Sequence, residues 1–357
     1  MELVELLTQM AGIDSVNPSL VPGGSGEGAM ADFVERWARE HGLDARRHEA
    51  TPGRPSVVVR SRRTAGRTLL LCAHLDTVGG GPPPRLDGDR FHGRGTYDMK
   101  AGLAAALLAC RDAQADVVVA AVADEEHASL GIREVLGHVR ADAAIVTEPT
   151  ELEIAIAHKG FVWAEIEVTG KAAHGSRPHL GVDAILKTGP VLTALSALGA
   201  TLGEHPLLGR GSLHASLIEG GEELSTYPAR CVLKLERRTL PGETAAGVER
   251  ELDALLERCR ALDPELVAER RTLLVREPFE VDPGAELVGL VREAIDAPVV
   301  GVSYWADSAF IAAAGIPTVL LGPVGAGAHA DDEWVSISSV QTLTRTLITV
   351  AERFCAR

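Results

Sequence analysis

Residues 69–76 read Leu-Leu-Leu-Cys-Ala-His-Leu-Asp, and residues 117–126 read Val-Val-Val-Ala-Ala-Val-Ala-Asp-Glu-Glu. Each stretch is a short apolar run that ends in polar side chains. Runs of this length without alternation indicate strands that are buried on both faces, as in parallel sheets. The Ala-rich segment 99–113 lies between these two strands and predicts a crossover helix. Three further runs have the same character, at 57–59, 143–146 and 318–321. The sequence therefore predicts an α/β fold with a mostly parallel sheet.

A second pattern replaces the first between about residues 159 and 274. In 162–168, apolar residues alternate with Glu165 and Glu167, which is typical of a strand with one solvated face. The elements that follow are a helix over 182–198, strands over 212–219 and 229–238, a helix over 243–262 and a strand over 265–274. Their order, βαββαβ, is that of a ferredoxin-like domain. We therefore expect a discontinuous domain and a domain inserted into it, residues 1–158 with 276–357 and residues 159–275.

The composition excludes several classes of protein. The chain has 357 residues, of which 46% are hydrophobic and 24% are charged, enough for about two packed domains and unlike a disordered chain. A net charge of −15 argues against nucleic acid or an anionic membrane as a partner. The first residues lack the cationic start of a signal peptide, and no apolar run is long enough to span a membrane. The five cysteines form no CxxC pair, so we expect reduced thiols in a cytoplasmic protein.

The polar residues that follow the buried strands form the candidate site. Because the carboxyl ends of parallel strands meet at one edge of a sheet, these side chains converge there. The set includes Asp98, just before the predicted crossover helix, and comprises His74, Asp76, Asp98, Glu125, Glu126, Glu148 and His329. So many carboxylates repel one another unless they bind protons or a cation. Imidazoles and carboxylates without thiolates suit Zn²⁺, with Co²⁺ or Mn²⁺ as alternatives.

Two metal ions account for this set better than one. We assign His74 and Glu148 to the first ion, Glu126 and His329 to the second, and Asp98 to a bridging position between them. Each ion then has three protein ligands and an open position for water, as catalytic metal sites require.

Two residues of the candidate site, Asp76 and Glu125, are not among these metal ligands. Asp76 lies two positions after His74 on an extended chain, so it points to the same side and can accept the second ring N–H of that histidine. Glu125 lies beside Glu126 and has no evident role as a ligand. It therefore suits a general base that deprotonates the metal-bridging water.

These motifs resemble those of the M20 metallopeptidase family, which includes acetylornithine deacetylase, succinyl-diaminopimelate desuccinylase, aminoacylase and carboxypeptidase G. The matching stretches are His74-x-Asp76, Asp98-Met99-Lys100-Ala101-Gly102, Asp124-Glu125-Glu126, Thr147-Glu148-Pro149 and Ala328-His329. The resemblance covers essentially the whole chain. It implies the same metal ligands, Glu125 as the base, Asp76 as support for the first metal ion, and a cis peptide bond after Asp98.

The resemblance also implies that the inserted domain is a lid and joins two chains in a homodimer. Residues 171–176 resemble the lid segment whose histidine, in dimeric relatives, enters the neighbouring subunit's site and polarises the scissile carbonyl. This assigns His174. Residues 236–243 resemble the segment whose arginine holds the substrate carboxylate, which assigns Arg238 rather than its neighbour Arg237.

Two further substrate contacts are expected. Ser225 occurs where many relatives carry an asparagine, so a shorter hydroxyl replaces that amide as a substrate-binding group. The glycine loop 322–327 precedes His329, and we expect it to offer backbone N–H groups, including that of Gly327, to a substrate carboxylate or oxyanion.

The expected function is metal-dependent hydrolysis of the amide bond of an N-acyl-L-amino acid, most like that of acetylornithine deacetylase. A dipeptidase or carboxypeptidase of the same family is an alternative, because a dipeptide presents the same amide and terminal carboxylate. An M28-type aminopeptidase is a second alternative, although the long insert between Glu148 and His329 argues against it. A non-catalytic metal-containing binding protein is a third, against which the intact Glu125 and the complete ligand set argue.

Overall fold

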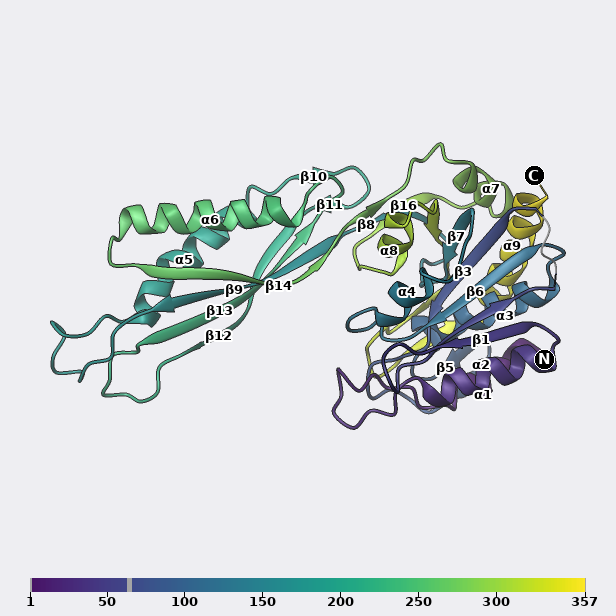
Figure 1. Ribbon diagram of the computed structural model, residues 1–357, viewed down its shortest axis with the longest axis horizontal. Coiled ribbons are helices and arrows are strands. Elements are labelled where there is room, and N and C mark those ends of the chain that lie inside the picture. Colours follow the sequence, from purple (N-terminus) through teal and green to yellow (C-terminus); the bar gives the residue numbers. More distant parts are fainter. Residues whose placement is uncertain (1, 63–65, 357) are drawn as a thin grey trace. The chain divides into compact units, whose positions relative to one another are not determined.

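The structure, a computed structural model, describes residues 2–62 and 66–356. It divides into two compact units (Figure 1). The first unit consists of the residues up to Ile156, Val281–Val300 and the residues from Ala306 on, and the second consists of Ala157–Glu280 and Gly301–Trp305.

Most strands of a nine-stranded sheet, counted over the described residues, belong to the first unit and form its centre, whereas β15 belongs to the second unit. Its order is β1-β2-β6-β3-β7-β17-β8-β15, with β16 paired to β8. The bounds are β1 (Asp44–His48), β2 (Ser56–Arg60), β3 (Thr68–His74), β6 (Asp116–Val122), β7 (Ala143–Val146), β8 (Ile154–His158), β15 (Phe279–Glu280), β16 (Val299–Val302) and β17 (Thr318–Leu320). The chain enters the second unit through β8 and leaves it after β15.

The four central strands, β6, β3, β7 and β17, are parallel and buried along their whole length. This confirms the predicted α/β fold with a parallel centre. The outer strands pair antiparallel, including β2, whose apolar run at 57–59 was grouped with the parallel strands. A short apolar run reports the burial of a strand but not its direction, so the sequence could not distinguish the two cases.

Helices cover both faces of this sheet. They are α1 (Glu2–Ala11), α2 (Gly28–Glu40), α3 (Ala101–Asp112), α4 (Leu130–Val135), α7 (Glu286–Ala294), α8 (Ser308–Ala313) and α9 (Ile337–Cys355). The chain moves one way from β3 to β6 and the other way from β6 to β7, so right-handed crossovers place α3 and α4 on opposite faces (Figure 1). The direction of the strand connections therefore reverses at β3. Ligands of open α/β sheets bind at such a reversal.

A smaller antiparallel sheet lies beside the start of α3. It consists of β4 (Arg85–Asp87), β5 (Arg90–His92), β18 (Gly325–Ala326) and β19 (Trp334–Ser336), in the order β18-β19-β5-β4. An irregular turn, Thr96–Lys100, leads from β5 into α3, and its Asp98–Met99 peptide bond is cis, as the family resemblance implied. His329 lies in the loop between β18 and β19, so this sheet brings the last predicted ligand towards the turn that carries Asp98.

The second unit is a four-stranded antiparallel sheet of order β12-β13-β9-β14. Its elements are β9 (Gly160–Thr169), α5 (Ala184–Gly199), β12 (Ser212–Gly220), β13 (Arg230–Thr239), α6 (Ala245–Leu262) and β14 (Val267–Arg276), with a hairpin of β10 (Glu204–His205) and β11 (Gly209–Arg210). Both helices pack on one face of the sheet, around a core that includes Ile166, Leu233 and Leu255. The element order is the predicted βαββαβ.

The five cysteines are buried free thiols. None of the helices in the described part of the chain combines the length and the apolar character needed to cross a membrane.

Candidate metal centre

The predicted polar residues of the first unit converge at the carboxyl edge of its parallel strands. His74 is the last residue of β3, and Glu125 and Glu126 follow β6. Glu148 is the second residue after β7, and Asp98 lies in the turn before α3. Because these strands are neighbours in the sheet, their ends carry the side chains to one place.

The side chain of Asp98 lies between two histidines. Its Oδ1 atom is 3.1 Å from Nε2 of His74, and its Oδ2 atom is 3.3 Å from Nε2 of His329. Each carboxylate oxygen therefore faces a different imidazole, which is the geometry of a carboxylate that bridges two cations.

Two glutamates complete the two ends of this arrangement. Oε1 of Glu148 is 3.8 Å from Nε2 of His74, and Oε2 of Glu126 is 3.0 Å from Nε2 of His329. The Glu125 carboxylate also lies close, since donor atoms of His74, Glu125 and Glu148 all fall within 4.8 Å of one another. The structure thus brings together the five residues predicted as ligands and the residue predicted as the base.

The pKa values of these side chains show that the cluster requires positive charge, from protons or from cations. Burial and the surrounding carboxylates raise the pKa of Glu125 and Glu148 well above the usual range, against the charge of His74. For His74, burial favours the neutral ring, but the hydrogen bond to Asp98 and the nearby carboxylates raise its pKa well above the usual range. Hydrogen bonds to Asp98 and a second carboxylate raise the pKa of His329 to about 10. Without a cation the cluster must hold protons instead, so the donor set fits divalent metal ions.

The position of Asp76 differs in one respect from the sequence expectation. Nδ1 of His74 is 2.8 Å from the backbone carbonyl oxygen of Asp76 and 3.8 Å from its carboxylate. The carboxylate instead accepts the backbone N–H groups of Glu125, at 3.1 Å, and Glu126, at 3.2 Å, and the side-chain amide of Asn17, at 2.7 Å. The ring nitrogen of His74 thus contacts the backbone carbonyl rather than the carboxylate. Asp76 thus supports His74 and both glutamates at once.

A buried polar network behind Asp76 was missed by sequence reasoning. The amide of Asn17 also donates to Asp124, at 3.0 Å, and Arg54 donates to Asp124 and to Glu27, both at 2.7 Å. Asp124 has a positive φ of 66°, so its backbone makes the turn that presents the next two residues. These polar residues come from distant parts of the chain, and no local spacing reveals that they meet.

Glu333 was also missed. Its carboxylate is fully buried and accepts the backbone N–H groups of Gly95, Tyr97 and Asp98 at 2.8, 2.9 and 3.0 Å, as well as Nη1 of Arg94 at 2.7 Å. In the sequence it ends an acidic run, Asp331-Asp332-Glu333, which is typical of a solvated loop. In the structure it fixes the turn that holds the bridging aspartate.

Comparison with known proteins identifies the family. The family model described as Peptidase family M20/M25/M40 matches residues 70–353. The chain belongs to this family. It is therefore a metal-dependent amidohydrolase, which excludes the M28-type alternative and the non-catalytic one.

Individual members of the family resemble the chain over almost its whole length. An acetylornithine deacetylase from Photorhabdus laumondii is 27% identical over 391 residues, covering 99% of this chain and 97% of that protein. A tripeptidase from Staphylococcus aureus has a similar structure, with a TM-score of 0.84, 18% identity and coverage of 99% of this chain and 98% of that one. A dinuclear metal-binding M20 peptidase from Bacillus subtilis has a TM-score of 0.76, 14% identity and coverage of 99% and 98%. The two structural likenesses show the fold.

In this M20 chain, three of the predicted site residues, His174, Ser225 and Arg238, belong to the second unit. His174 is exposed and pairs with Thr226 in an isolated β-bridge. The N–H of Gly175 donates to the carbonyl of Ser225 at 2.6 Å. The loops that carry His174 and Ser225 therefore lie side by side within this unit.

The neighbouring arginines of β13 have different environments. Arg237 is completely buried and forms an ion pair of 2.7 Å with Glu243, so its charge is already used inside the unit. The Arg238 guanidinium lies 5.0 Å from the ring centre of Phe161 and pairs with Glu236 at 2.7 Å, and the side chain stays 30% exposed. Of the two, Arg238 has the more exposed side chain.

The glycine loop before His329 is more fully hydrogen-bonded than expected. Three of its N–H groups already have acceptors in the first unit, with Gly322 donating to Thr150 at 3.0 Å, Val324 to Ser339 at 2.9 Å and Gly325 to Glu151 at 3.3 Å. The expectation was therefore wrong for these three groups. Gly327 has a φ of 83°, and a Cβ atom there would come within 2.9 Å of the Cα atom of Glu333. Only glycine fits this position.

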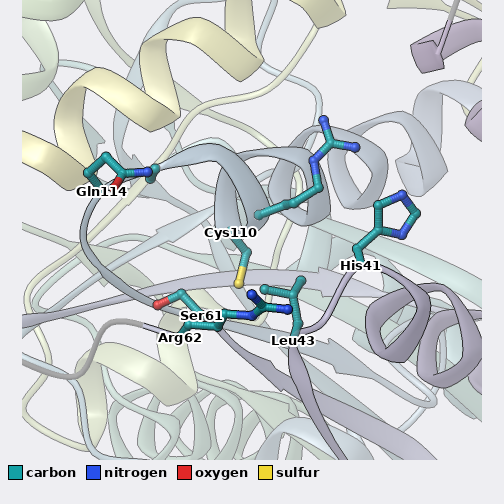
Figure 2. A pocket seen from close by; sticks show the side chains of 8 residues that line it. His41, Leu43, Ser61, Arg62, Cys110 and Gln114 are labelled. Atoms are coloured by element: carbon teal, nitrogen blue, oxygen red, sulfur yellow. The ribbon is translucent and has the colours of Figure 1, made fainter.

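The first unit also contains a cavity of about 210 Å³ that is separate from the metal centre (Figure 2). Its lining residues are His41, Leu43, Ser61, Arg62, Cys110, Arg111, Ala113 and Gln114. Ala113 and Gln114 precede the first residue of β6, whereas Glu125 and Glu126 follow its last residue. The cavity is thus at the opposite edge of the sheet from the metal centre.

Proposed function

We propose that this M20 amidohydrolase removes the acyl group from an N-acyl-L-amino acid, in the manner of an acetylornithine deacetylase. The observation that carries this proposal is the position of Asp98, whose two carboxylate oxygens face His74 and His329. Acetylornithine deacetylases that match over nearly the whole chain support this substrate class. The net charge of −15 favours approach of a substrate with a cationic side chain, such as that of ornithine.

We propose two divalent metal ions as cofactors, Zn²⁺ in the first place, with Co²⁺ and Mn²⁺ as alternatives. His74 and Glu148 would hold one ion, Glu126 and His329 the other, and Asp98 would bind both. When bound, such ions polarise the amide carbonyl and lower the pKa of water. The dinuclear peptidase of the same fold and the donor groups within 4.8 Å support this assignment.

Glu125 acts as the general base and then as the general acid. It is buried beside the ligands, and its backbone is held by Asp76. In the proposed reaction the Glu125 carboxylate takes a proton from the attacking water as that water adds to the amide carbon. It then delivers this proton to the leaving amine nitrogen, so the bond between carbonyl carbon and nitrogen breaks without net loss of a proton.

The second unit supplies the substrate contacts in this proposal and acts as a lid. His174 donates to the oxyanion that develops on the scissile carbonyl, as a residue contributed by the partner subunit. Arg238 binds the free carboxylate of the substrate, because a guanidinium pairs with a carboxylate through two parallel hydrogen bonds. Ser225 of the same unit and the backbone N–H of Gly327, which belongs to the first unit, complete the set of substrate-binding groups.

We further propose that the chain forms a homodimer through this unit. β12 is the edge strand of the four-stranded sheet, and its Leu217 and Ile218 are 57% and 52% exposed. On α5, which packs on β12, Leu186 is 74% exposed. An open strand edge flanked by apolar side chains favours pairing with a second copy. The free thiols support a reducing compartment such as the cytoplasm.

A substrate panel tests the function. Acetyl, succinyl, glutamyl and aminoacyl derivatives of several amino acids, N-acetylornithine among them, would be assayed with Zn²⁺, Co²⁺ and Mn²⁺. We expect N-acetyl amino acids to be hydrolysed fastest. Faster turnover of the aminoacyl derivatives would favour a dipeptidase or carboxypeptidase, the activity class to which the tripeptidase neighbour points. Absence of turnover on the whole panel with both metal ions bound would contradict the proposal.

A further inference from the structure

A second group of metal-binding side chains lies in the first unit and shares no residue with the catalytic centre. It consists of His48, Glu134 and His138, and one donor atom of each falls within 4.8 Å of the others. His48 is the last residue of β1, the edge strand of the large sheet, and Glu134 belongs to α4. The cluster thus joins two elements that are far apart in the sequence.

The backbone holds these three side chains together. The N–H of Ala50 donates to Oε1 of Glu134 at 2.9 Å, which fastens the chain after β1 to α4. The N–H of His138 donates to the carbonyl of Val135 at 2.9 Å, so a helical turn continues past the end of α4. Glu134 and His138 are four positions apart and therefore lie on the same side of this turn.

The donor set is that of a transition-metal site. The rings of His48 and His138 stack with centroids 4.7 Å apart and an angle of 29° between their planes. The N–H of Ala50 donates to Oε1 of Glu134. The second oxygen, Oε2, can therefore bind an ion without breaking that hydrogen bond. Two imidazoles and one carboxylate are the protein ligands of four-coordinate zinc sites in which water takes the fourth position. They also bind Ni²⁺ and Cu²⁺, and Cu²⁺ most tightly.

The surroundings leave room for a hydrated ion. A cavity of about 270 Å³ is lined by His48 and His138 together with three arginines, Arg46, Arg60 and Arg140. Two of these cations are paired, Arg46 with Asp44 at 3.3 Å and Arg60 with Asp116 at 2.7 Å. Donor atoms on one ion at about 2.1 Å lie at most about 4.2 Å apart, and the ion lies close to the plane of each imidazole ring. Binding therefore requires the exposed ring of His138 to turn out of its stack on His48 by rotating about its side-chain bonds.

We propose that His48, Glu134 and His138 form a separate transition-metal site that clamps the edge strand β1 to α4. α4 starts four residues after Glu126, so an ion at this site ties the segment that follows the catalytic turn to the sheet. This site takes no part in the hydrolytic reaction.

Metal counting tests this proposal. Wild-type protein with its catalytic centre filled would be dialysed against micromolar Zn²⁺, and the bound zinc would be measured by elemental analysis. We expect one more ion per chain in the wild type than in His48→Ala or His138→Ala, with the same hydrolytic activity in all three. Glu134→Gln keeps an acceptor for Ala50 but loses the charged ligand, so we expect at least about tenfold weaker binding of this ion.

His41→Ala is the matched control, because His41 also stacks on an aromatic ring, that of Trp37 at 4.2 Å, but belongs to no donor cluster. It should bind as much zinc as the wild type. Should His48→Ala fold poorly, His138→Ala still tests the site, because its side chain is exposed. Electron paramagnetic resonance of added Cu²⁺ gives a second readout, in which nitrogen hyperfine structure should be present in the wild type and lost in His138→Ala. Equal zinc content in the wild type and His138→Ala would overturn the proposal, as would an equal loss in His41→Ala.

Discussion

The buried carboxylate of Glu333 accepts a hydrogen bond of 3.0 Å from the backbone N–H of Asp98. The bridging aspartate is thus held by a residue 235 positions further along the chain. Without that support, the turn before α3 would lack an acceptor for several of its N–H groups, because Gly95 and Tyr97 donate to the same carboxylate.

Glu333→Gln tests this relationship. An amide offers one accepting oxygen and an NH₂ group, so at least one of the four donors around Glu333 would face another donor. Breaking the buried pair with Arg94 should lower the free energy of unfolding by about 3–5 kcal/mol. We also expect weaker metal binding, because Asp98 loses its fixed position. Urea unfolding and metal titration measure the two effects. The control is Asp332→Asn at an exposed neighbour, with an expected change within about 0.5 kcal/mol. Metal affinity that stays unchanged in Glu333→Gln would show that the turn is held in another way.

Glu125→Gln should separate catalysis from metal binding. The amide keeps the shape of the side chain but cannot take a proton, so turnover should fall by at least about 10²- to 10⁴-fold while metal content stays near that of the wild type. Glu126→Gln is the matched comparison and should lose metal and activity together. Steady-state kinetics and elemental analysis check both variants. Near-normal turnover of fully metallated Glu125→Gln would remove this residue from the role of base.

Metal binding should release protons. In the metal-free protein the pKa of His329 is about 10 and that of His74 is well above its usual range, because both rings are hydrogen-bonded to Asp98. Both rings are therefore positively charged at neutral pH, with a proton on each nitrogen, and each must lose one of these two protons to bind a metal ion. Metal affinity should rise with pH between about 6 and 9, by about tenfold per unit for each proton released.

Calorimetry in two buffers of different ionisation enthalpy measures the number of protons released at pH 7. His174→Ala should release as many protons as the wild type, whereas His329→Ala should release fewer. Proton release that does not differ from zero would be incompatible with the assigned ligands.

His174→Ala should reduce turnover more than substrate affinity, because the histidine is proposed to act on the developing oxyanion. If it acts across a dimer, mixing inactive His174→Ala with inactive Glu125→Gln should restore activity. Equal mixing should give about a quarter of the wild-type turnover, since half of the dimers are mixed and one of their two sites is complete. No recovery after subunit exchange has been verified by mass spectrometry would exclude action in trans.

Arg238→Ala and Arg237→Ala should change different properties, substrate discrimination in the first case and stability in the second. Arg238 is proposed to bind the free carboxylate, so its loss should reduce the discrimination between N-acyl amino acids and their methyl esters by about 1.5–3 kcal/mol. Arg237 is buried and paired with Glu243, so its loss should instead lower the free energy of unfolding by about 3–5 kcal/mol. Values of kcat/KM for acid and ester, and urea unfolding curves, test the two effects. Equal turnover of acid and ester by the wild type would contradict the role given to Arg238.

Much of the fold could be predicted because burial leaves a simple pattern in the sequence. The apolar runs of β3, β6 and β7 became parallel central strands, and the polar residues directly after them converged at one edge. The alternation in 162–168 likewise became β9 of the second unit. Such patterns report which side chains are covered, and the sheet then determines where their neighbours lie.

The remaining features depend on contacts between distant residues. The strands β4, β5, β18 and β19 have two or three residues each, too few for a visible period. Arg54 and Glu27 meet Asp124 only in the folded chain, and neither residue has a neighbour that marks it. His74 contacts the backbone carbonyl of Asp76 at 2.8 Å, whereas the carboxylate lies 3.8 Å away. Spacing along the chain does not distinguish these two acceptors on the same residue.

The arrangement around Asp98 also has a consequence for the order of events during protein synthesis. The ribosome produces Asp98 first, then the whole second unit, and only afterwards His329 and Glu333. Domains generally fold as units while the chain emerges. The second unit can thus be complete before the first has its last ligand or the glutamate that orders the bridging turn. A nascent chain offers a complete binding site to metal ions only once translation has passed residue 333, so full metal loading must follow the synthesis of the second unit.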